Sequence, residues 1–567
     1  MEFSLLQPSD LDITYKVLSP QSINDLSLDY ICDALTKDKF EKNSIKLLMT
    51  KITDDERVIQ YRRDIFDDLY KNPNLRTELE QLLAKLVDLK ELEKFQKDTE
   101  ASDLWMLINR LREIDGYVCC ITKIKESLEN IDIHSHGLLE LKRLVTEIHD
   151  KSGFPQIKAD IEETLAKAQQ IKSITIGVNL DNLLRPKNAG IISLNSHTIT
   201  DSGLLRNFMQ FTSKKDELYG GTAFTSLKSF HPLNPPTGKS GIAQVVVGGH
   251  NEVHSIMTNE VPTGSDQLSS NITKTVTAIV KKIVRDIQNT LQKYINISGF
   301  TLVSLVPEII FYIRWAELIE KMQSKGLTLC KANILPTARR ELFTKDVYNI
   351  KLAIKVLQGE NIDIIGNDFE FSDKGRIYIM TGPNRGGKTT FTQAIGIASL
   401  MAQNGIYAPA AEFSFSPFDN IFTHFPADEN ETVDLGRLGE ESQRIADIFN
   451  KATDKSLLLF NESLATTNVA EGLYIAKDVV KAMRYIGTRT IFNTHMHELA
   501  RHLDTLNRET EGTSKVESLI TGVENGNRSF KVSIAPPQGV SYARDIAIKY
   551  GVTFEQIKNK LDEAKSN

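Results

Sequence analysis

The amino-acid sequence predicts a multidomain protein in which a helical N-terminal part precedes a C-terminal α/β domain. A chain of 567 residues is long enough for about three to four domains. Apolar residues recur at spacings of three and four from about Ser22 to Lys172, as they do along one face of a helix. From about Lys351 the pattern alternates between strand, turn and helix, which is typical of a mostly parallel sheet covered by helices.

Composition narrows the class of protein. Apolar residues make up 41% of the chain and charged residues 25%, and no run approaches the roughly 18 apolar residues of a membrane span. The N-terminal stretch MEFSLLQPSDLDITYK has no basic flank before an apolar run, so it does not predict a secretory signal. We therefore expect a cytoplasmic protein with no membrane contact. The formal net charge of -6 gives no overall attraction for nucleic acid, so DNA binding would depend on local basic patches.

The first predicted region, residues 1–172, is helical. Between Leu75 and Phe95 five leucines lie on one stripe, which is typical of a helix that faces the core of a bundle. These leucines are Leu79, Leu82, Leu83, Leu86 and Leu89. The chain also has four cysteines, which are Cys32, Cys119, Cys120 and Cys330. They are too few and too irregularly spaced for a disulfide framework or a zinc ribbon, so we expect reduced core thiols.

The second predicted region, residues 173–266, combines strand and loop. The segment SITIGVNLD alternates apolar and polar residues as a strand does, and Gly, Pro, Ser and Asn then become frequent. His250 and His254 have the spacing of metal ligands, but their Gly-rich surroundings give no helix to present them, so we do not predict a metal site there.

The third predicted region, residues 267–345, returns to a helical pattern. One of its helices has an excess of basic residues, which leaves open a solvated helix face or a surface that follows phosphates. The basic residues are Lys274, Lys281, Lys282, Arg285 and Lys293. Residues 346–567 form the fourth predicted region, the α/β domain.

A phosphate-binding loop opens this α/β domain. The apolar strand Ile377 to Met380 leads into GPNRGGKT, which has the spacing G-x-x-x-x-G-K-[ST] in the strand-to-helix context that the motif requires. Its glycines let backbone N–H groups surround phosphate oxygens at the start of a helix that ends near Asn404 and Gly405. Lys388 would reach the β- and γ-phosphates of ATP, and Thr389 would offer its hydroxyl to Mg²⁺. The predicted nucleotide-binding residues are Gly382, Pro383, Asn384, Gly386, Gly387, Lys388, Thr389 and Thr390.

A second buried strand supplies the predicted catalytic carboxylate. Leu457 to Phe460 are apolar and are followed by Asn461 and Glu462, about 70 residues after the phosphate-binding loop. We expect Glu462 to polarise the attacking water. Asn461 stands where an Asp would help to hold the metal, and its neutral amide oxygen contributes no charge. The sequence therefore predicts an ATPase with weakened Mg²⁺ binding and slow hydrolysis.

These motifs resemble the MutS-type ATPases of DNA mismatch repair, a branch of the ABC-like ATPases. TGPNRGGKTTFTQ resembles the phosphate-binding loop of that family, and MAQNGIYAPA, FDNIFTHF, FNTHMHELA and GVSYARDIAIKYGV resemble later segments in the same order. Upstream, LSLDYICDALT and ITDDERVIQYRRDIFDDL look like the start of its helical core and lever region. The resemblance implies a helical core and lever region followed by a C-terminal ABC-like P-loop ATPase domain. It also implies that residues 173–266 are a possible DNA clamp and that His495 senses the γ-phosphate.

Three departures from the family pattern change what the resemblance implies. The helical core begins almost at residue 20 and no Phe-x-Glu motif occurs in the first 345 residues, so we expect no mismatch-recognition domain and no classical mismatch reading. Asn461-Glu462 replaces the usual Asp-Glu pair, and SLATTN replaces the glycine-rich run after it. Finally, DLGRLGEES takes the place of a signature that usually contains Ser-Thr-Phe.

The signature segment matters because the resemblance implies a composite site between two subunits. In ABC-like ATPases the start of a helix in one subunit faces the γ-phosphate bound by the other. Gly436, Arg437 and Gly439, ahead of the helical run EESQRIADIFNKA, would act in this way, with Arg437 adding a charge. A plain loop with a helix cap stays open as the alternative. Arg385 faces either the partner subunit or solvent.

Two functions follow from these features. The first is a homodimeric DNA-binding ATPase in which Mg²⁺-ATP controls a clamp on DNA structures other than simple mismatches, together with repair or recombination proteins. The second is an ATP-binding dimerisation switch or protein-recruiting scaffold with little or no hydrolysis. The neutral Asn461 and the negative net charge of the chain favour the second function. The complete phosphate-binding loop, Glu462 and His495 favour the first, which we adopt as the prediction.

Overall fold

In a computed structural model, the 567-residue chain forms two compact units. Unit 1 comprises residues 1–76, 132–140 and 307–567, and unit 2 comprises residues 77–131 and 141–306. The four segments predicted from the sequence cut the chain differently and stay a prediction about its domains. The structure describes residues 3–95, 104–129, 131–150, 154–169, 173–180, 182–183, 186–195, 289, 300–383, 385–426, 436–464, 469–512, 514–524, 527–537, 548 and 550–559.

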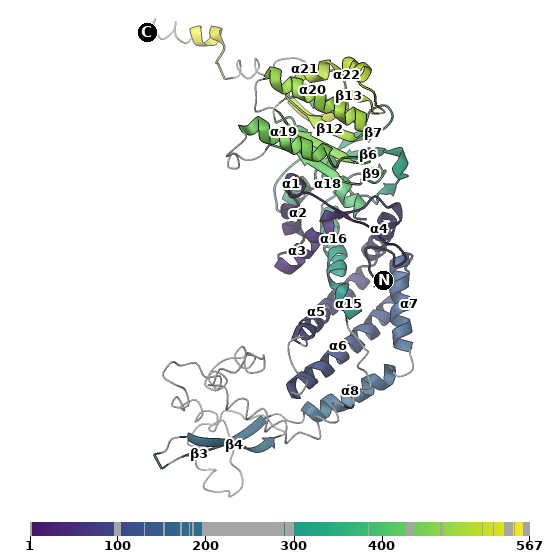
Figure 1. Ribbon diagram of the computed structural model, residues 1–567, viewed down its shortest axis with the longest axis vertical. Helices are drawn as coiled ribbons and strands as arrows, with labels where there is room; N and C mark the ends of the chain where they lie inside the picture. The colour runs from purple at the N-terminus through teal and green to yellow at the C-terminus, as the bar shows by residue number, and fades with distance from the viewer. Residues whose placement is uncertain are drawn as a thin grey trace. The chain divides into compact units, whose positions relative to one another are not determined.

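Unit 2 is mainly helical and also contains a β-hairpin (Figure 1). Its helices are most of α5 (Pro73–Phe95), α6 (Leu104–Glu129), most of α7 (His136–Asp150), α8 (Phe154–Gln169) and α15 (Phe300–Ser304). The predicted leucine stripe on α5 is confirmed for Leu79, Leu82, Leu83 and Leu86, which are all buried. The predicted strand at Ser173 is confirmed as β3 (Ser173–Leu180), and it pairs antiparallel with β4 (Pro186–Asn195). His250, His254 and the basic side chains of residues 274–293 lie outside the described residues.

Unit 1 begins with short helices and continues into the α/β part. Its N-terminal elements are β1 (Lys16–Val17), α1 (Pro20–Asp25), α2 (Leu28–Leu35), α3 (Lys39–Thr50), β2 (Lys51–Ile52) and α4 (Glu56–Lys71). The chain returns to this unit in α16 (Val306–Ser324), η3 (Thr337–Arg339) and α17 (Ile350–Leu357). None of the helices in the described part of the chain has both the length and the apolar character needed to cross a membrane. All four cysteines are free, and Cys32 and Cys120 are buried.

The predicted parallel sheet is present and has six strands in the order β10–β11–β12–β8–β13–β14. The first five strands run parallel and β14 runs antiparallel to β13. The strands are β8 (Ile377–Thr381), β10 (Ile421–His424), β11 (Leu457–Asn461), β12 (Arg489–Asn493), β13 (Val516–Glu524) and β14 (Asn527–Ile534). Every residue of β8, β11 and β12 is buried, as expected for strands covered on both faces.

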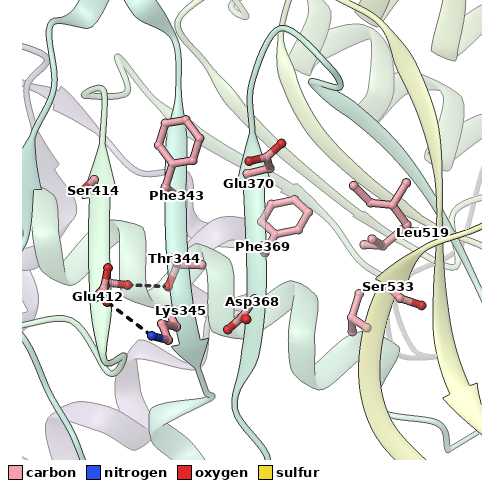
Figure 2. Close-up of a pocket in the computed structure, with 12 residues that line it drawn as sticks. Phe343, Thr344, Lys345, Asp368, Phe369, Glu370, Glu412, Ser414, Leu519 and Ser533 are labelled. Atoms are coloured by element: carbon pink, nitrogen blue, oxygen red, sulfur yellow. Dashed lines mark hydrogen bonds and ion pairs between the residues drawn. The ribbon is translucent and has the colours of Figure 1, made fainter.

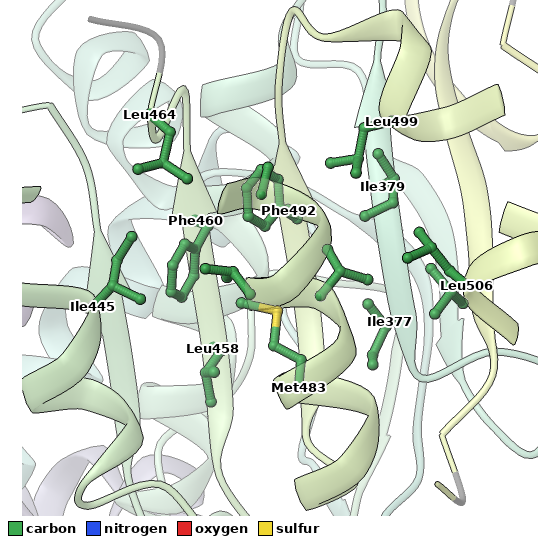
Figure 3. Packing of buried hydrophobic residues seen from close by; sticks show 14 of the residues in the cluster. Ile377, Ile379, Ile445, Leu458, Phe460, Leu464, Met483, Phe492, Leu499 and Leu506 are labelled. Carbon is green, nitrogen blue, oxygen red and sulfur yellow. The ribbon is translucent and has the colours of Figure 1, made fainter. Parts of the chain in front are cut away.

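One face of this sheet packs against four helices. These are α19 (Gly436–Phe449), α20 (Val469–Ile486), α21 (His497–Arg501) and α22 (Leu503–Glu509). Figure 3 shows Ile445 from α19 and Met483 from α20 against Leu458, Phe460 and Phe492 of the strands. Apolar residues at alternate strand positions form this cluster, because successive side chains of a strand point to opposite faces.

The other face packs against α18 (Lys388–Gln403), the helix that follows the phosphate-binding loop. The helix is buried along most of its length because the N-terminal helices contact it as well. At Gly396 an added Cβ would lie 2.5 Å from Leu459 Cδ1 and 2.7 Å from Leu26 Cδ2, so a larger residue would force these two leucine side chains to shift. The predicted end of the helix is confirmed, with Asn404 as the C-cap and Gly405 at a φ of 80°.

A second sheet, which the sequence pattern did not predict, lies in the same unit. Its strand order is β5–β9–β6–β7, in which only β5 and β9 run parallel. The strands are β5 (Asn333–Ile334), β6 (Leu342–Val347), β7 (Asn367–Phe371) and β9 (Glu412–Phe415). The chain is therefore a mixed helical and α/β protein with several sheets.

Arg489 joins the starts of the central strands. Its guanidinium group is fully buried and donates hydrogen bonds to the backbone oxygens of Ser416 (2.6 Å), Pro417 (2.9 Å) and Lys455 (2.6 Å). It also lies 3.8 Å from the centre of the Phe418 ring. Burial lowers its pKa to about 9, so the group stays charged at neutral pH.

We expect Arg489→Met to lower the free energy of unfolding by at least about 3 kcal/mol, because three buried carbonyl groups would lose a charged donor. Urea unfolding followed by circular dichroism measures this loss. Arg501→Met is the control, since Arg501 is half exposed and pairs only with Glu498 on the same helix among the described contacts. Equal unfolding curves for the two variants would contradict the structural role of Arg489.

His424 gives the unit a defined pH dependence. It is buried against Phe460, and burial, followed by the charge of Arg444, lowers its pKa from 6.5 to about 4. The unfolded chain therefore binds the proton at a higher pH than the folded chain does. The free energy of unfolding should fall as the pH drops from 6.5 to 4, with at most about 1.4 kcal/mol per pH unit coming from this group.

His424→Asn tests this prediction, because Asn keeps a hydrogen-bond donor but does not titrate in this range. Urea unfolding at pH 7, 6 and 5 should show a smaller loss of stability for the variant than for the wild type. Parallel losses in the two proteins would mean that other groups cause the acid sensitivity.

Candidate functional site

The candidate site lies where three neighbouring parallel strands end. Asn461 at the end of β11 is paired in register with Asn493 of β12, and Asn493 is paired with Met380 of β8. Because the carboxyl ends of parallel strands meet at one edge of a sheet, the phosphate-binding loop, Glu462 and His495 all emerge there. The sheet order therefore brings together residues that are more than 70 positions apart in the chain.

The phosphate-binding loop has a backbone that only glycine permits at several points. Gly382 and Gly387 have φ angles of 148° and 90°. A Cβ on Gly382 would lie 2.0 Å from Thr521 Oγ1, and one on Gly386 would lie 2.8 Å from the backbone oxygen of Pro383. Arg385 between them is exposed and has a φ of 59°. Asn384, which the sequence also assigned to nucleotide binding, lies outside the described residues.

Lys388 bends back over this loop. Its Nζ donates to the backbone oxygens of Gly382 and Pro383, each at 3.1 Å. Burial lowers the pKa of Lys388, while the negative charge of Glu462 acts in the opposite direction. A cation held over a loop of backbone N–H groups, at the start of α18, fits a polyphosphate.

Thr389 and Asn461 form the predicted metal-binding pair. The Thr389 hydroxyl donates to Asn461 Oδ1 at 2.9 Å, and Asn493 Nδ2 also donates to this oxygen. Both predicted ligands are neutral oxygens, and the part of the chain that the structure describes contains no cluster of three or more His, Cys, Asp or Glu suited to a metal. Mg²⁺ often binds few protein ligands and takes its other oxygens from water and phosphate, so the pair fits this ion.

Glu462 and His495 are also adjacent. His495 Nε2 lies 2.8 Å from Glu462 Oε1, and both side chains are about one third exposed. This hydrogen bond is the main cause of the lowered pKa of Glu462, which is therefore a carboxylate at neutral pH. Glu462 has a φ of 52°, an uncommon conformation for a residue other than glycine and one that occurs often at functional sites.

A cavity of about 490 Å³ opens beside the loop. Arg385 through Thr390 and Glu462 form its polar side, and the walls come from segments that the motif analysis did not single out. These wall residues include Tyr348, Leu352, Ile362, Ile365 and Phe530. Phe530 belongs to β14 and has no sequence signal for this role. Asn493 had a signal, because it is a polar residue at the end of a buried strand, directly before Thr494 and His495.

A second cavity, of about 410 Å³, lies over the four-stranded sheet (Figure 2). It is lined by Asp368, Glu370 and Glu412 and by a single lysine, Lys345, which pairs with Glu412 at 3.6 Å. Its described lining has excess negative charge and contains no residue of the phosphate-binding loop. A polyphosphate would be repelled there, so the cavity beside Lys388 is the candidate nucleotide site.

The predicted signature residues lie in the first turn of a helix. The sequence placed Gly436, Arg437 and Gly439 ahead of the helical run, but α19 already begins at Gly436, so this boundary was wrong. Two glycines did not prevent helix formation because the apolar face of α19 packs on the sheet, and such packing outweighs local propensity. The Arg437 side chain and most of the predicted C-terminal segment 539–552 lie outside the described residues.

Comparison with known proteins finds similarity to MutS-type proteins in two parts of the chain. The profile of MutS domain V matches residues 378–542, and that of the MutS2 N-terminal domain matches residues 54–325. The DNA mismatch repair protein MutS of Caldicellulosiruptor saccharolyticus is 26% identical over 616 aligned positions, which cover all of this chain and 63% of that protein. The MutS of Chlorobium limicola is 37% identical over 166 residues, 29% of this chain and 18% of that protein.

The chain thus spans less than two thirds of the length of these relatives. The two profiles nevertheless match separate parts of the chain and both describe domains of MutS-type proteins, one in the helical part and one around the phosphate-binding loop. The chain belongs to the MutS family.

Proposed function

We propose that the chain is an ATPase that uses ATP binding and hydrolysis, as a homodimer, to control its hold on DNA. The observation that carries this proposal is the meeting of Lys388, Thr389, Asn461, Glu462 and His495 at the ends of three parallel strands beside one cavity. Membership of a family of DNA mismatch repair proteins supports the DNA part of the proposal.

The phosphates of ATP would bind at the loop that Lys388 now covers. Lys388 would exchange the carbonyl oxygens of Gly382 and Pro383 for phosphate oxygens, which carry more negative charge. Thr389 and Asn461 would hold Mg²⁺, and the ion would neutralise developing charge on the phosphate oxygens. Since Asn461 adds no charge, we propose that Mg²⁺ binds more weakly here than beside an Asp.

Glu462 and His495 would have different roles at the γ-phosphate. Glu462 is ionised, so it can accept a hydrogen bond from the attacking water and orient it. His495 Nε2 carries a single proton and uses it in the hydrogen bond to Glu462. If His495 turns to a γ-phosphate oxygen, it must release Glu462, so arrival of ATP would free the carboxylate for water.

The dimer and the DNA contacts belong to the same proposal. In an ABC-like arrangement the start of α19, with Gly436, Arg437 and Gly439, would face the nucleotide of the partner subunit. Residues 173–266, which include the hairpin β3–β4, would form a clamp on DNA. The first 345 residues contain no Phe-x-Glu motif, so we propose that the DNA structure bound is not a simple mismatch.

Lys388→Ala should abolish steady-state ATP hydrolysis, and Glu462→Gln should lower kcat by about 10²-fold or more while ATP still binds. The first variant removes the cation that holds the phosphates, whereas the second removes only the group that orients water. Hydrolysis should change when duplex or branched DNA is added at low salt, and DNA affinity should fall as salt rises. Wild-type turnover equal to that of Lys388→Ala would refute the proposed ATPase.

Asn461→Asp discriminates the ATPase from a switch that binds ATP with little turnover. The new carboxylate would accept a hydrogen bond from the Thr389 hydroxyl, as Asn461 does, and would add a negative charge beside the metal. We expect at least about tenfold tighter Mg²⁺ activation and a higher kcat, because a carboxylate binds Mg²⁺ better than an amide. A Mg²⁺ titration of ATPase rate measures both, and unchanged values would show that Asn461 does not limit the site.

A further inference from the structure

The backbone directly after Glu462 is held in an unusual conformation. Glu462 and Leu464 have φ angles of 52° and 62°, in the left-handed region that residues with a side chain rarely adopt. Neither residue is a glycine, so the conformation must be imposed by the surrounding structure. The direction of the Glu462 carboxylate depends on it, because a side chain follows its own backbone.

Three different elements hold this short segment, residues 462–464. The Glu462 N–H donates to the backbone oxygen of Asn493 on β12 at 2.8 Å. Ser463 Oγ donates to the backbone oxygen of His424 on β10 at 3.0 Å and lies 2.7 Å from His424 Nδ1. The Leu464 N–H donates to Glu441 Oε2 of α19 at 2.8 Å.

The contact with Ser463 determines which ring nitrogen of His424 carries the proton. A serine hydroxyl has one hydrogen, and it is used toward the backbone oxygen of His424. Nδ1 of His424 must therefore carry a proton and donate to Ser463 Oγ. The pKa of His424 is lowered to about 4 by burial, so the ring stays neutral at physiological pH and this contact does not switch there.

The Glu441 contact is the only one of the three that a helix side chain makes. Glu441 is 8% exposed, and a buried carboxylate is costly unless its oxygens accept hydrogen bonds. Figure 3 shows the Leu464 side chain in the core beside Phe460 and Ile445, and Ile445 comes one turn after Glu441 on α19. A shift of α19 would therefore move Leu464 through both its backbone and its side chain.

We propose that Glu441 is a positioning residue for Glu462, and that it ties the orientation of the catalytic carboxylate to the position of α19. The bond to the Leu464 N–H, together with the contact between His424 and Ser463, keeps Glu462 and Leu464 in their left-handed conformation. This role rests on the proposed ATPase function. Since α19 begins at Gly436, any ligand or subunit that moves the start of this helix also turns Glu462.

Three variants of the full chain test this role through ATP hydrolysis and ATP binding. Glu441→Ala removes the acceptor for the Leu464 N–H, so we expect kcat to fall at least tenfold while the Kd for ATP changes less than threefold. Glu441→Gln keeps an oxygen that can accept this bond, so it should recover most of the lost kcat. Asp447→Ala removes an exposed carboxylate from the same helix and should match the wild type.

Amide hydrogen exchange at Leu464 in the nucleotide-free protein gives a readout that does not depend on turnover. Exchange should be faster in Glu441→Ala than in the wild type or in Asp447→Ala. If Glu441→Ala does not fold, Ser463→Ala replaces it, because it removes both bonds to His424 with a small change in volume and should lower kcat severalfold.

The outcomes separate the two proposals. Normal turnover in the wild type and in every variant, or unchanged exchange at Leu464, would overturn the role of Glu441 and leave the ATPase proposal standing. A wild type that binds ATP but shows no more turnover than Lys388→Ala would overturn both. An equal loss of kcat in Glu441→Ala and Glu441→Gln would mean that the charge of Glu441, and not its hydrogen bond, is what matters, which contradicts the positioning role.

Discussion

The parallel register of β11, β12 and β8 is the constraint on which the site depends. Asn461, Asn493 and Met380 lie at the same level of the sheet, so the segments that follow them leave the sheet together. The strands are fully buried, and a slip of one residue would turn their core side chains to the opposite face. The hydrophobic clusters on both faces therefore also fix the relative positions of the polar groups at the strand ends.

The same sheet links the candidate nucleotide site to the N-terminal helical segment through α18. Two glutamine side chains on this helix donate to backbone oxygens of that segment: the partly buried Gln393 to Asp25 at 2.8 Å and the buried Gln403 to Thr53 at 2.9 Å. Arg62 of α4 in turn donates to Asn404 at 3.1 Å. Buried polar bonds of this kind leave little freedom for sliding, since a broken bond leaves an unpaired polar group in the core. These bonds hold α18, which begins at Lys388, against the N-terminal helical segment.

Asn461 acquires a clear role in this framework. Its side-chain oxygen accepts from Thr389 and Asn493 at once, so it organises the site as a hydrogen-bond acceptor. An aspartate would do the same and would also bring a charge. The chain has thus kept the geometry of this position without the charge, while Glu462 remains ionised and is held by His495. Binding and hydrolysis of nucleotide would accordingly be affected to different degrees, which is the basis of the two functions weighed for this protein.

The sequence by itself determined the elements with strong local signals. The leucine stripe of α5, the strand before the phosphate-binding loop, the helix from Lys388 to Gln403 and the strand ending at Asn461 all follow from periodicity and from glycine chemistry. The sequence also named Lys388, Thr389 and Glu462, from the phosphate-binding motif and the end of a buried strand, and it named His495 through the resemblance to MutS-type ATPases. The four-stranded sheet was not predicted, since its short strands, such as Asn333–Ile334, carry too few residues to show a period.

Only the tertiary structure decided which residues meet across the sheet. Nothing in the local sequence indicates that Phe530 lines the candidate nucleotide cavity, or that Glu441 binds the backbone of Leu464. The start of α19 at Gly436, against the low helix propensity of glycine, is likewise set by packing of its apolar face. These contacts join segments far apart in the chain. They depend on strand order and register, which arise from the burial of all strands together and not from the pattern within any one of them.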